Sequence, residues 1–211
     1  MITPYFEKDI SQWLDITKVL IDEHPLDIAE IVEVTLTSWK QIFDSRIGPL
    51  SIGEQIFPSP QIMSNILHEL IPYNLTEKFG RNYRIGNSKN EKDIVYTPDL
   101  KYSIEVKASS SKNDIYANRS YAQPMQVLDG KNKDGYYIAV NFEKFKINSD
   151  GEYKSKIIDI NGLVEYPSIT LIKFGYLEHT DWIPQKSSKG QQARLSVESK
   201  RNKLLTIYCK E

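Results

Sequence analysis

Apolar residues in the first part of the chain recur at the spacing of an α-helix. Between residues 26 and 44 they lie three or four positions apart, which gives a helix one apolar face. These residues are Ile28, Ile31, Val32, Leu36, Trp39, Ile42 and Phe43. We therefore expect helices over 7–23 and 26–44. Ser59 followed by Pro60 is typical of a helix start, so a third helix is expected over 59–71, with Pro72 ending it.

Beyond residue 79 the apolar pattern becomes that of β-strands. Short runs of β-branched and aromatic residues between turn residues predict strands over 79–85, 93–97, 102–108, 135–142, 153–160 and 168–177. A turn over 98–101 joins the second and third strands into a hairpin. The run 135–142 is the most apolar and is expected at the centre of the sheet. A polar loop over 178–194 and a final segment over 203–209 close the chain.

Helices followed by a mixed β-sheet predict an α/β fold with the sheet flanked by helices. The length of 211 residues, with 40% apolar and 26% charged residues, suits one folded domain over 1–211. Within it we expect a helical N-terminal segment over 1–58. No apolar run approaches the roughly 20 residues of a membrane-spanning helix, and the N-terminus lacks a signal-peptide pattern. Because Cys209 is the single cysteine, no internal disulfide is possible, and we expect a cytoplasmic protein with no membrane partner.

The residues from 92 to 107 carry the most specific chemistry. Glu105 and Lys107 are two positions apart on a predicted strand, so their side chains point to the same face. The preceding strand begins with Asp93, and the hairpin can bring its carboxylate beside Glu105. Two carboxylates and a backbone carbonyl, that of Val106, form an oxygen site suited to Mg²⁺. A lysine beside that ion can position the attacking water and stabilise charge on phosphorus.

This stretch resembles the PD-(D/E)xK nuclease superfamily, whose motif is an acidic residue, a variable spacer, and then Asp or Glu, any residue and Lys. The resemblance implies a nuclease core with Asp93, Glu105 and Lys107 as catalytic residues and with Asp93, Glu105 and the Val106 carbonyl as metal ligands. The literal Pro98-Asp99 pair also matches, but Asp99 lies in the predicted turn, so we favour Asp93. The alternative is that Glu-x-Lys belongs to a solvated sheet face.

Nucleases of this superfamily often add an acidic residue from the first helix of the core. Glu69 on the predicted helix and Glu54 just before it are candidates for such a supporting acid. For each of them, a surface or capping carboxylate is the alternative.

A second resemblance covers roughly residues 65–195. The chain is similar to the ScaI-type restriction endonucleases in several blocks, which are Leu67-His-Glu-Leu-Ile-Pro72, Lys92-Asp-Ile-Val95, Ser103-Ile-Glu-Val-Lys-Ala-Ser-Ser110, Asn118-Arg-Ser-Tyr121, Val140-Asn-Phe142, Gly175-Tyr-Leu-Glu-His-Thr-Asp-Trp182 and Gly190-Gln-Gln-Ala-Arg194. This resemblance implies a homodimer that cleaves a short palindrome in double-stranded DNA with Mg²⁺. It also implies 5′-phosphate and 3′-hydroxyl ends that are blunt. The region 59–211 would then hold the catalytic core and the DNA-contacting loops.

The near-zero formal charge of -1 hides an asymmetry along the chain. Residues 1–58 hold 4 Lys and Arg against 10 Asp and Glu, whereas residues 173–211 hold 8 against 4. The C-terminal part is therefore the better candidate for contact with phosphate.

Two polar segments are expected to contact DNA. In the major groove, glutamine pairs with adenine and arginine pairs with guanine, whereas lysine and serine suit phosphate contacts. The candidates are Lys112, Asn118, Arg119 and Ser120 after the catalytic strand, and Gln185, Lys186, Lys189, Gln191, Gln192 and Arg194 in the polar loop. A connector and an ordinary surface loop are the respective alternatives. His179 and Asp181 lack an accompanying nucleophile or metal-ligand spacing, so we expect a structural or DNA-contacting pair.

The leading hypothesis is a type II restriction endonuclease, and two alternatives remain. One is a structure-selective repair or recombination nuclease with the same core. The other is a DNA-binding protein without catalysis, in which Glu105 and Lys107 form only a surface ion pair.

Overall fold

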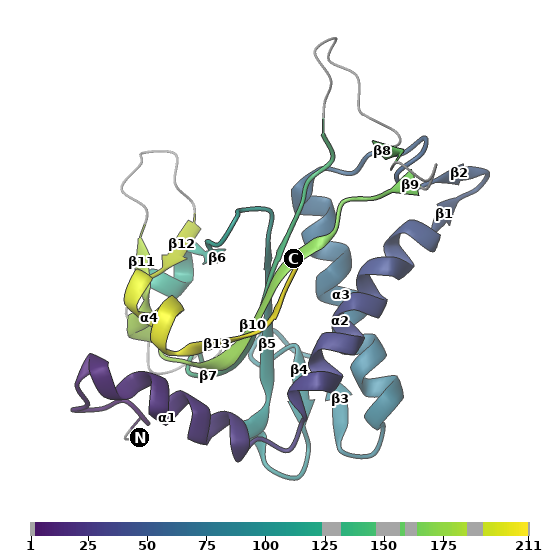
Figure 1. Cartoon of the computed structure of the whole chain (residues 1–211). Coiled ribbons are helices and arrows are strands. Elements are labelled where there is room, and N and C mark those ends of the chain that lie inside the picture. The colour runs from purple at the N-terminus through teal and green to yellow at the C-terminus, as the bar shows by residue number, and fades with distance from the viewer. Residues whose placement is uncertain (1–2, 124–131, 147–156, 159–163, 185–191, 211) are drawn as a thin grey trace.

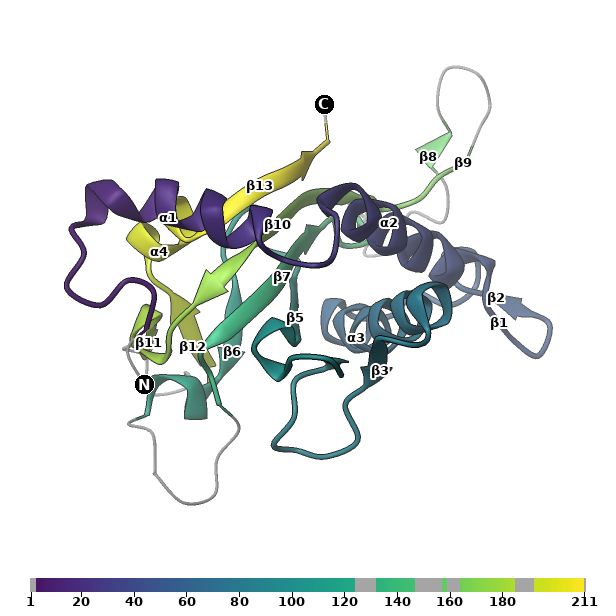
Figure 2. The same cartoon turned by 90° about the horizontal axis from the view of Figure 1, so that it is seen from below.

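The computed structural model describes residues 3–123, 132–146, 157–158, 164–184 and 192–210. They form a mixed six-stranded sheet with helices packed on it (Figures 1 and 2). The described α-helices are α1 (Ile10–Asp22), α2 (Ile28–Asp44), α3 (Pro60–Phe79) and α4 (Val197–Asn202). Three 3₁₀ turns are η1 (Leu100–Tyr102), η2 (Arg119–Ala122) and η3 (His179–Asp181).

The main sheet has the strand order β13-β10-β7-β5-β4-β3. Its strands are β3 (Tyr83–Ile85), β4 (Ile94–Tyr96), β5 (Ile104–Ser109), β7 (Gly135–Phe142), β10 (Ile169–Leu177) and β13 (Leu204–Cys209). Only β5 and β7 run parallel among these neighbours, and the other pairs are antiparallel. All of β7 is buried in the middle of the sheet, which confirms the expected central strand. The predicted mixed sheet flanked by helices is therefore confirmed.

Smaller sheets extend this framework. A three-stranded sheet has the order β11-β12-β6, and two hairpins are formed by β1 with β2 and by β8 with β9. Their bounds are β1 (Arg46–Ile47), β2 (Leu50–Ser51), β6 (Tyr116–Asn118), β8 (Ile157–Ile158), β9 (Val164–Glu165), β11 (Trp182–Pro184) and β12 (Gln192–Leu195). The strands β1, β2, β6, β9, β11 and β12 were not predicted from the sequence pattern.

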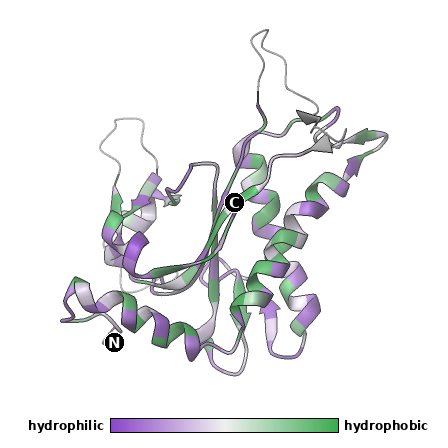
Figure 3. Cartoon of the chain, in the orientation of Figure 1, coloured by the Kyte–Doolittle hydropathy of each residue, from purple (hydrophilic) through white to green (hydrophobic). Residues whose placement is uncertain are grey.

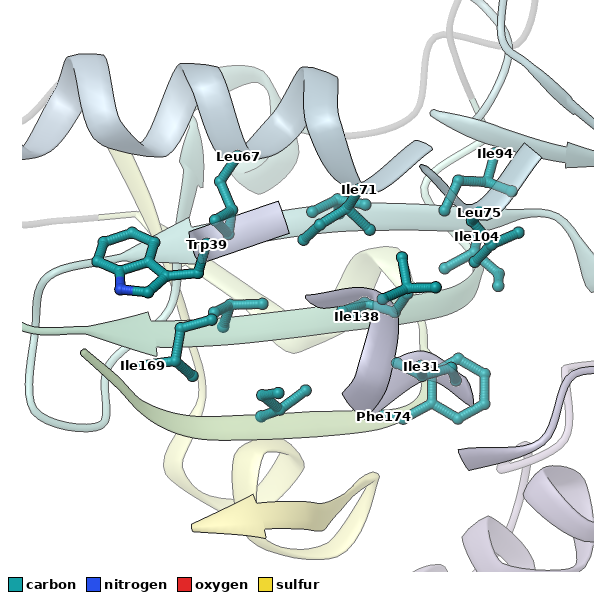
Figure 4. Packing of buried hydrophobic residues seen from close by; sticks show 14 of the residues in the cluster. Ile31, Trp39, Leu67, Ile71, Leu75, Ile94, Ile104, Ile138, Ile169 and Phe174 are labelled. Atoms are coloured by element: carbon teal, nitrogen blue, oxygen red, sulfur yellow. The ribbon is translucent and has the colours of Figure 1, made fainter. Parts of the chain in front are cut away.

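The two faces of the main sheet bury different cores. On one face Ile104, Ile138 and Phe174 pack with Ile31 and Leu67, which belong to α2 and α3 (Figure 4). The opposite face carries a smaller core of aromatic and aliphatic residues that includes the three-stranded sheet. Its members are Ile115, Ala117, Tyr121, Tyr137, Ala139, Leu177, Trp182, Ala193, Leu195 and Leu204. Side chains that alternate along β5 therefore face either the helices or this second core.

The two N-terminal helices lie close to their predicted positions because both have strong N-caps. Asp9 forms a capping box with Gln12 at the start of α1, and Asp27 caps α2 by accepting from the backbone of Ala29. Helix α1 packs against α4, β10 and β13, whereas α2 packs on α3. The hydropathy colouring of Figure 3 shows hydrophobic residues along the central strands and mixed colours on the helices.

The third helix is longer than predicted, because α3 continues through Pro72 to Phe79. A proline inside a helix removes one backbone hydrogen bond and crowds the preceding turn. Leu67, Ile71 and Leu75 are fully buried on either side of Pro72, so burial of the apolar face offsets that loss. The predicted strand over 79–85 consequently shrinks to β3.

The prediction of a polar loop over 178–194 was wrong for most of the described residues in that range, because they form η3, β11 and part of β12. Trp182, Ala193 and Leu195 are buried in the second core, and this burial holds β11 and β12 as paired strands. Of the strand expected over 153–160, only β8 falls within the described residues. No helix of the described residues is long and apolar enough to span a membrane.

Candidate active site

Strand β5 presents Glu105 and Lys107 on the face of the second core. The Lys107 Nζ lies 2.6 Å from Oε1 of Glu105, and their side chains are 12% and 2% exposed. The register pairs Glu105 with Tyr137 on β7, and Ile104 and Val106 are fully buried on the helix side of the sheet. This burial is inconsistent with a solvated sheet face or a surface ion pair.

Asp93 reaches the same strand from the start of the predicted hairpin. Strand β4 pairs with β5 at only one position, Ile94 with Ile104, so the two strands diverge beyond it. The backbone N–H of Val106 donates to Oδ2 of Asp93 over 2.7 Å. Since the N–H and C=O of one strand residue point the same way, the Val106 carbonyl also faces away from β7. Lys107 Nζ lies 3.2 Å from that carbonyl oxygen.

Two side chains that were not predicted as site residues also belong to this site. His68, on α3, places Nε2 at 3.3 Å from Oδ2 of Asp93. Tyr121, on η2, donates its hydroxyl to Oε1 of Glu105 over 2.7 Å. His68 adjoins Glu69, which was proposed, but a step of one residue along a helix turns to a different face. Both contacts depend on tertiary packing, and no local pattern indicates them.

Burial, and then the adjacent Glu105 carboxylate, raise the pKa of Tyr121 well above its usual value. Burial is also the main reason why the pKa of Tyr137 is raised, and the neighbouring Tyr121 and then Glu105 raise it further. Both hydroxyls therefore stay protonated at neutral pH, and Tyr121 acts as a hydrogen-bond donor to the carboxylate. The site combines two carboxylates, one ammonium and neutral phenols.

The donor set of the site fits Mg²⁺. Among the described residues, no three or more His, Cys, Asp and Glu side chains come together as metal ligands, so a metal ion at this site would depend on two carboxylates and a backbone carbonyl. Asp93, Glu105 and the Val106 carbonyl supply oxygens only. Mg²⁺ commonly takes one or two carboxylates and completes its shell with water and substrate phosphate.

Asp99, which was not favoured as a metal ligand, and the two candidate supporting acids, Glu54 and Glu69, each have different neighbours. Asp99 caps η1 by accepting from the backbone of Lys101, and its carboxylate lies 3.3 Å from Lys101 Nζ. Glu54 lies beside Tyr166, whose pKa is raised by burial and then by this carboxylate. Glu69 is exposed on α3 but lines the cleft described next.

A cleft of about 920 Å³ opens beside Lys107. One wall is the N-terminal half of α3, and the opposite wall is formed by β6 and β12, which lie on the other side of β5 from α3 (Figure 1). Among the residues that line it are Gln61, Ser64, Asn65, His68, Glu69, Lys107, Ser109, Ser110, Ser111, Tyr116, Asn118 and Gln192. Most of these side chains are polar and neutral, so the cleft offers many hydrogen-bond donors and acceptors.

The structure brings only some of the expected DNA-contacting residues into this cleft. Asn118 and Gln192 are direct cross-strand partners of β6 and β12, both exposed, and they share its wall. Arg194 lies two positions further along β12, opposite Tyr116. Three others are exposed outside the cleft lining, namely Lys112, Arg119 and Ser120. The remaining four, Gln185, Lys186, Lys189 and Gln191, lie outside the described residues.

His179 and Asp181 have separate structural partners. The backbone N–H and Nδ1 of His179 lie 2.7 and 3.2 Å from Oδ1 of Asp134. Asp181 is buried and lies 2.8 Å from the buried Nζ of Lys203. The two residues therefore do not form a catalytic pair with each other.

A mixed sheet flanked by helices, with two carboxylates and a lysine beside a polar cleft, is the arrangement expected of a nuclease with the PD-(D/E)xK motif. The model of the ScaI restriction endonuclease family matches residues 3–208. The chain belongs to the ScaI restriction endonuclease family. The prediction of a type II restriction endonuclease is therefore confirmed.

Two known proteins are similar to this chain to different degrees. The type II restriction enzyme ScaI of Streptomyces caespitosus is 42% identical over 207 residues, which are 98% of this chain and 85% of that protein. A crystal structure of the restriction endonuclease BglI bound to its DNA recognition sequence matches with a TM-score of 0.42 and 9% identity. That match covers 95% of this chain and 88% of the other.

Proposed function

We propose that this chain cleaves a short palindrome in double-stranded DNA by Mg²⁺-dependent hydrolysis of a phosphodiester bond in each strand. The products carry 5′-phosphate and 3′-hydroxyl ends and are blunt. The observation that supports this proposal best is the convergence of Asp93, Glu105 and Lys107 at the edge of the polar cleft. Membership of the ScaI restriction endonuclease family favours site-specific cleavage over the action of a repair nuclease.

In this proposal Asp93, Glu105 and the Val106 carbonyl hold Mg²⁺. When bound, the ion would supply positive charge to the phosphate and make a nearby water more acidic. Lys107, whose Nζ lies 2.6 Å from Oε1 of Glu105, would lie beside the reacting phosphate. It also orients the attacking water by donating a hydrogen bond.

The DNA backbone and base edges would occupy the cleft. Asn118 and Gln192 can donate to and accept from a base edge at once, and the serines of residues 109–111 suit contacts to phosphate oxygens. Asn118 and Gln192 lie on the wall opposite α3, so they would face the duplex close to the scissile bond. Lys112, Arg119 and Arg194 would contact phosphates or flanking bases.

We infer that the active form is a homodimer. A palindrome presents the same sequence on both strands, and a symmetric dimer presents two equivalent sites. The site of one protomer then cleaves one strand, and the site of the other protomer cleaves the second strand. A protein that remains monomeric on its DNA would contradict this part of the proposal.

Plasmid cleavage by Asp93→Asn and Asp99→Asn tests the assignment with matched substitutions. Asp93→Asn removes one charged ligand and is expected to lower cleavage at least about 100-fold, equivalent to about 2.7 kcal/mol. Asp99→Asn changes only a half-exposed carboxylate that caps η1, so the cleavage activity of this variant should remain within about twofold of wild type. Reversal of this order would overturn the ligand assignment.

The same plasmid assay tests the function itself. Discrete fragments that need Mg²⁺ support a restriction enzyme. Nicking without sequence preference would support a repair nuclease instead, and binding without cleavage in any divalent ion would contradict the proposal.

A further inference from the structure

Tyr121 contacts both members of the Glu105–Lys107 pair. Its hydroxyl donates to Oε1 of Glu105 over 2.7 Å, and the Nζ of Lys107 lies 4.9 Å from the centre of its ring. Only 8% of the residue is exposed. We propose that Tyr121 is a positioning residue that holds Glu105 and Lys107 in their reactive arrangement. This inference rests on the proposed function.

The hydroxyl acts on the orientation of the carboxylate. Lys107 and Tyr121 donate to the same oxygen of Glu105, over 2.6 and 2.7 Å respectively. Two donors on one oxygen fix the plane of the carboxylate and the direction of its other oxygen. A ligand held in one orientation binds a metal ion without first losing rotational freedom, so removal of the hydroxyl should weaken metal binding.

The aromatic ring acts on the lysine. An ammonium near an aromatic ring is attracted by the quadrupole of the ring, and the attraction is larger where water is excluded. Lys107 has a side chain that is only 12% exposed, and the Tyr121 ring adds to its contacts with Glu105 and the Val106 carbonyl. Removal of the ring together with the hydroxyl should therefore disturb Lys107 more than removal of the hydroxyl alone.

The position of Tyr121 is itself held by the second core. Its ring packs edge-on against Trp182 with centroids 5.1 Å apart, and η2 follows β6 directly in the chain. Strand β6 in turn pairs with β12 through Asn118 and Gln192. The three-stranded sheet that forms one wall of the cleft therefore also fixes the residue that orients the catalytic pair.

Two substitutions separate the contributions. Tyr121→Phe removes the hydroxyl and keeps the ring, whereas Tyr121→Leu removes both. Tyr136→Phe is the matched control, because the Tyr136 hydroxyl donates to Leu20 O over 2.9 Å on the opposite face of the sheet, and its loss has a structural effect only.

The readouts are calorimetric binding of Mn²⁺ to the whole protein, alone and with duplex DNA, and the steady-state kinetics of plasmid cleavage. For Tyr121→Phe we expect the Mn²⁺ dissociation constant to rise about tenfold and kcat to fall about tenfold, with KM for DNA within twofold. Tyr121→Leu should lower kcat about tenfold further. Tyr136→Phe should leave all three values within twofold of wild type.

The inference is overturned if Tyr121→Phe binds Mn²⁺ and turns over DNA like wild type, or if the control loses as much as Tyr121→Phe. It is also overturned if the wild-type protein binds no Mn²⁺ under either condition. Those outcomes are distinct from failure of the proposed function, which is judged by whether the wild type cleaves and Asp93→Asn does not.

Discussion

Lys203 is the most deeply buried cation among the described residues, and its removal should strongly destabilise the protein. Its side chain is 1% exposed and forms ion pairs with Glu178 and with Asp181, the latter at 2.8 Å. The Nζ also lies 4.3 and 4.2 Å from the ring centres of Tyr5 and Trp13. Lys203→Met keeps most of the aliphatic volume but leaves two buried carboxylates without this cation.

The expected loss follows from those surroundings. Removing one partner of a buried ion pair costs about 3–5 kcal/mol, because the remaining charge is left without compensation. Burial already raises the pKa of Asp181, even though Lys203 and the hydrogen bonds to it act to lower that pKa. We therefore expect Lys203→Met to lower the free energy of unfolding by about 4 kcal/mol. For a chain of this length the Tm should fall by roughly 8–16 °C.

Equilibrium denaturation with urea measures this free energy directly. Lys40→Met is the control, because the Lys40–Asp44 pair is 76% and 59% exposed and should change stability by less than about 0.5 kcal/mol. Adding Glu178→Gln to Lys203→Met should recover part of the loss by removing one uncompensated charge. A loss below about 1 kcal/mol in Lys203→Met, or a further loss in the double variant, would refute the reasoning.

Two further predictions concern pH dependence and DNA contact. Burial lowers the pKa of His24 from 6.5 to about 4. Above pH 6.5 this group contributes its full stabilisation of about 3 kcal/mol. The contribution is lost as the pH falls from 6.5 to 4, because the unfolded chain takes up the proton before the folded chain does. Urea denaturation across that range should therefore show a steeper loss of stability in wild type than in His24→Gln, and equal slopes would contradict the assignment. Gln192→Ala should weaken binding to the cognate duplex about tenfold relative to other duplexes. Lys112→Ala should instead weaken binding to all duplexes alike, and the salt dependence of the DNA affinity should fall by about one released counterion. Gel-shift titrations at several salt concentrations measure both effects, and a loss of discrimination in Lys112→Ala would reverse the two roles.

The core of the candidate site could be predicted because its contacts are local in the chain. Glu105 and Lys107 share a face through the two-residue period of a strand, and Asp93 is brought to them by a hairpin of predictable length. The same local information shows that Asp99 belongs to a turn. The central apolar strand likewise follows from a run of a few residues.

The surrounding residues could not be predicted because their positions depend on packing between distant segments. His68 meets Asp93 only because α3 lies against β5, and Tyr121 meets Glu105 because η2 is held in the second core. Asn118 and Gln192 were each proposed from their residue type, but their cross-strand pairing joins segments far apart in the chain. Pro72 illustrates the same limit for the fold, since burial of the neighbouring apolar residues outweighs its local preference.

The burial of Glu105 and Lys107 is itself an argument for a functional role. Transferring a carboxylate and an ammonium from water into a protein carries a desolvation cost that their mutual attraction often fails to offset, and apolar residues of similar volume are frequently as stable or more stable there. Strand β5 already has two fully buried apolar residues, Ile104 and Val106, on its other face, so the fold does not need charge at these positions for cohesion. Lys107 lines the cleft while Glu105 is 2% exposed behind it. A pair that is costly to bury and open to the cleft on one side is expected where charge develops on a bound substrate.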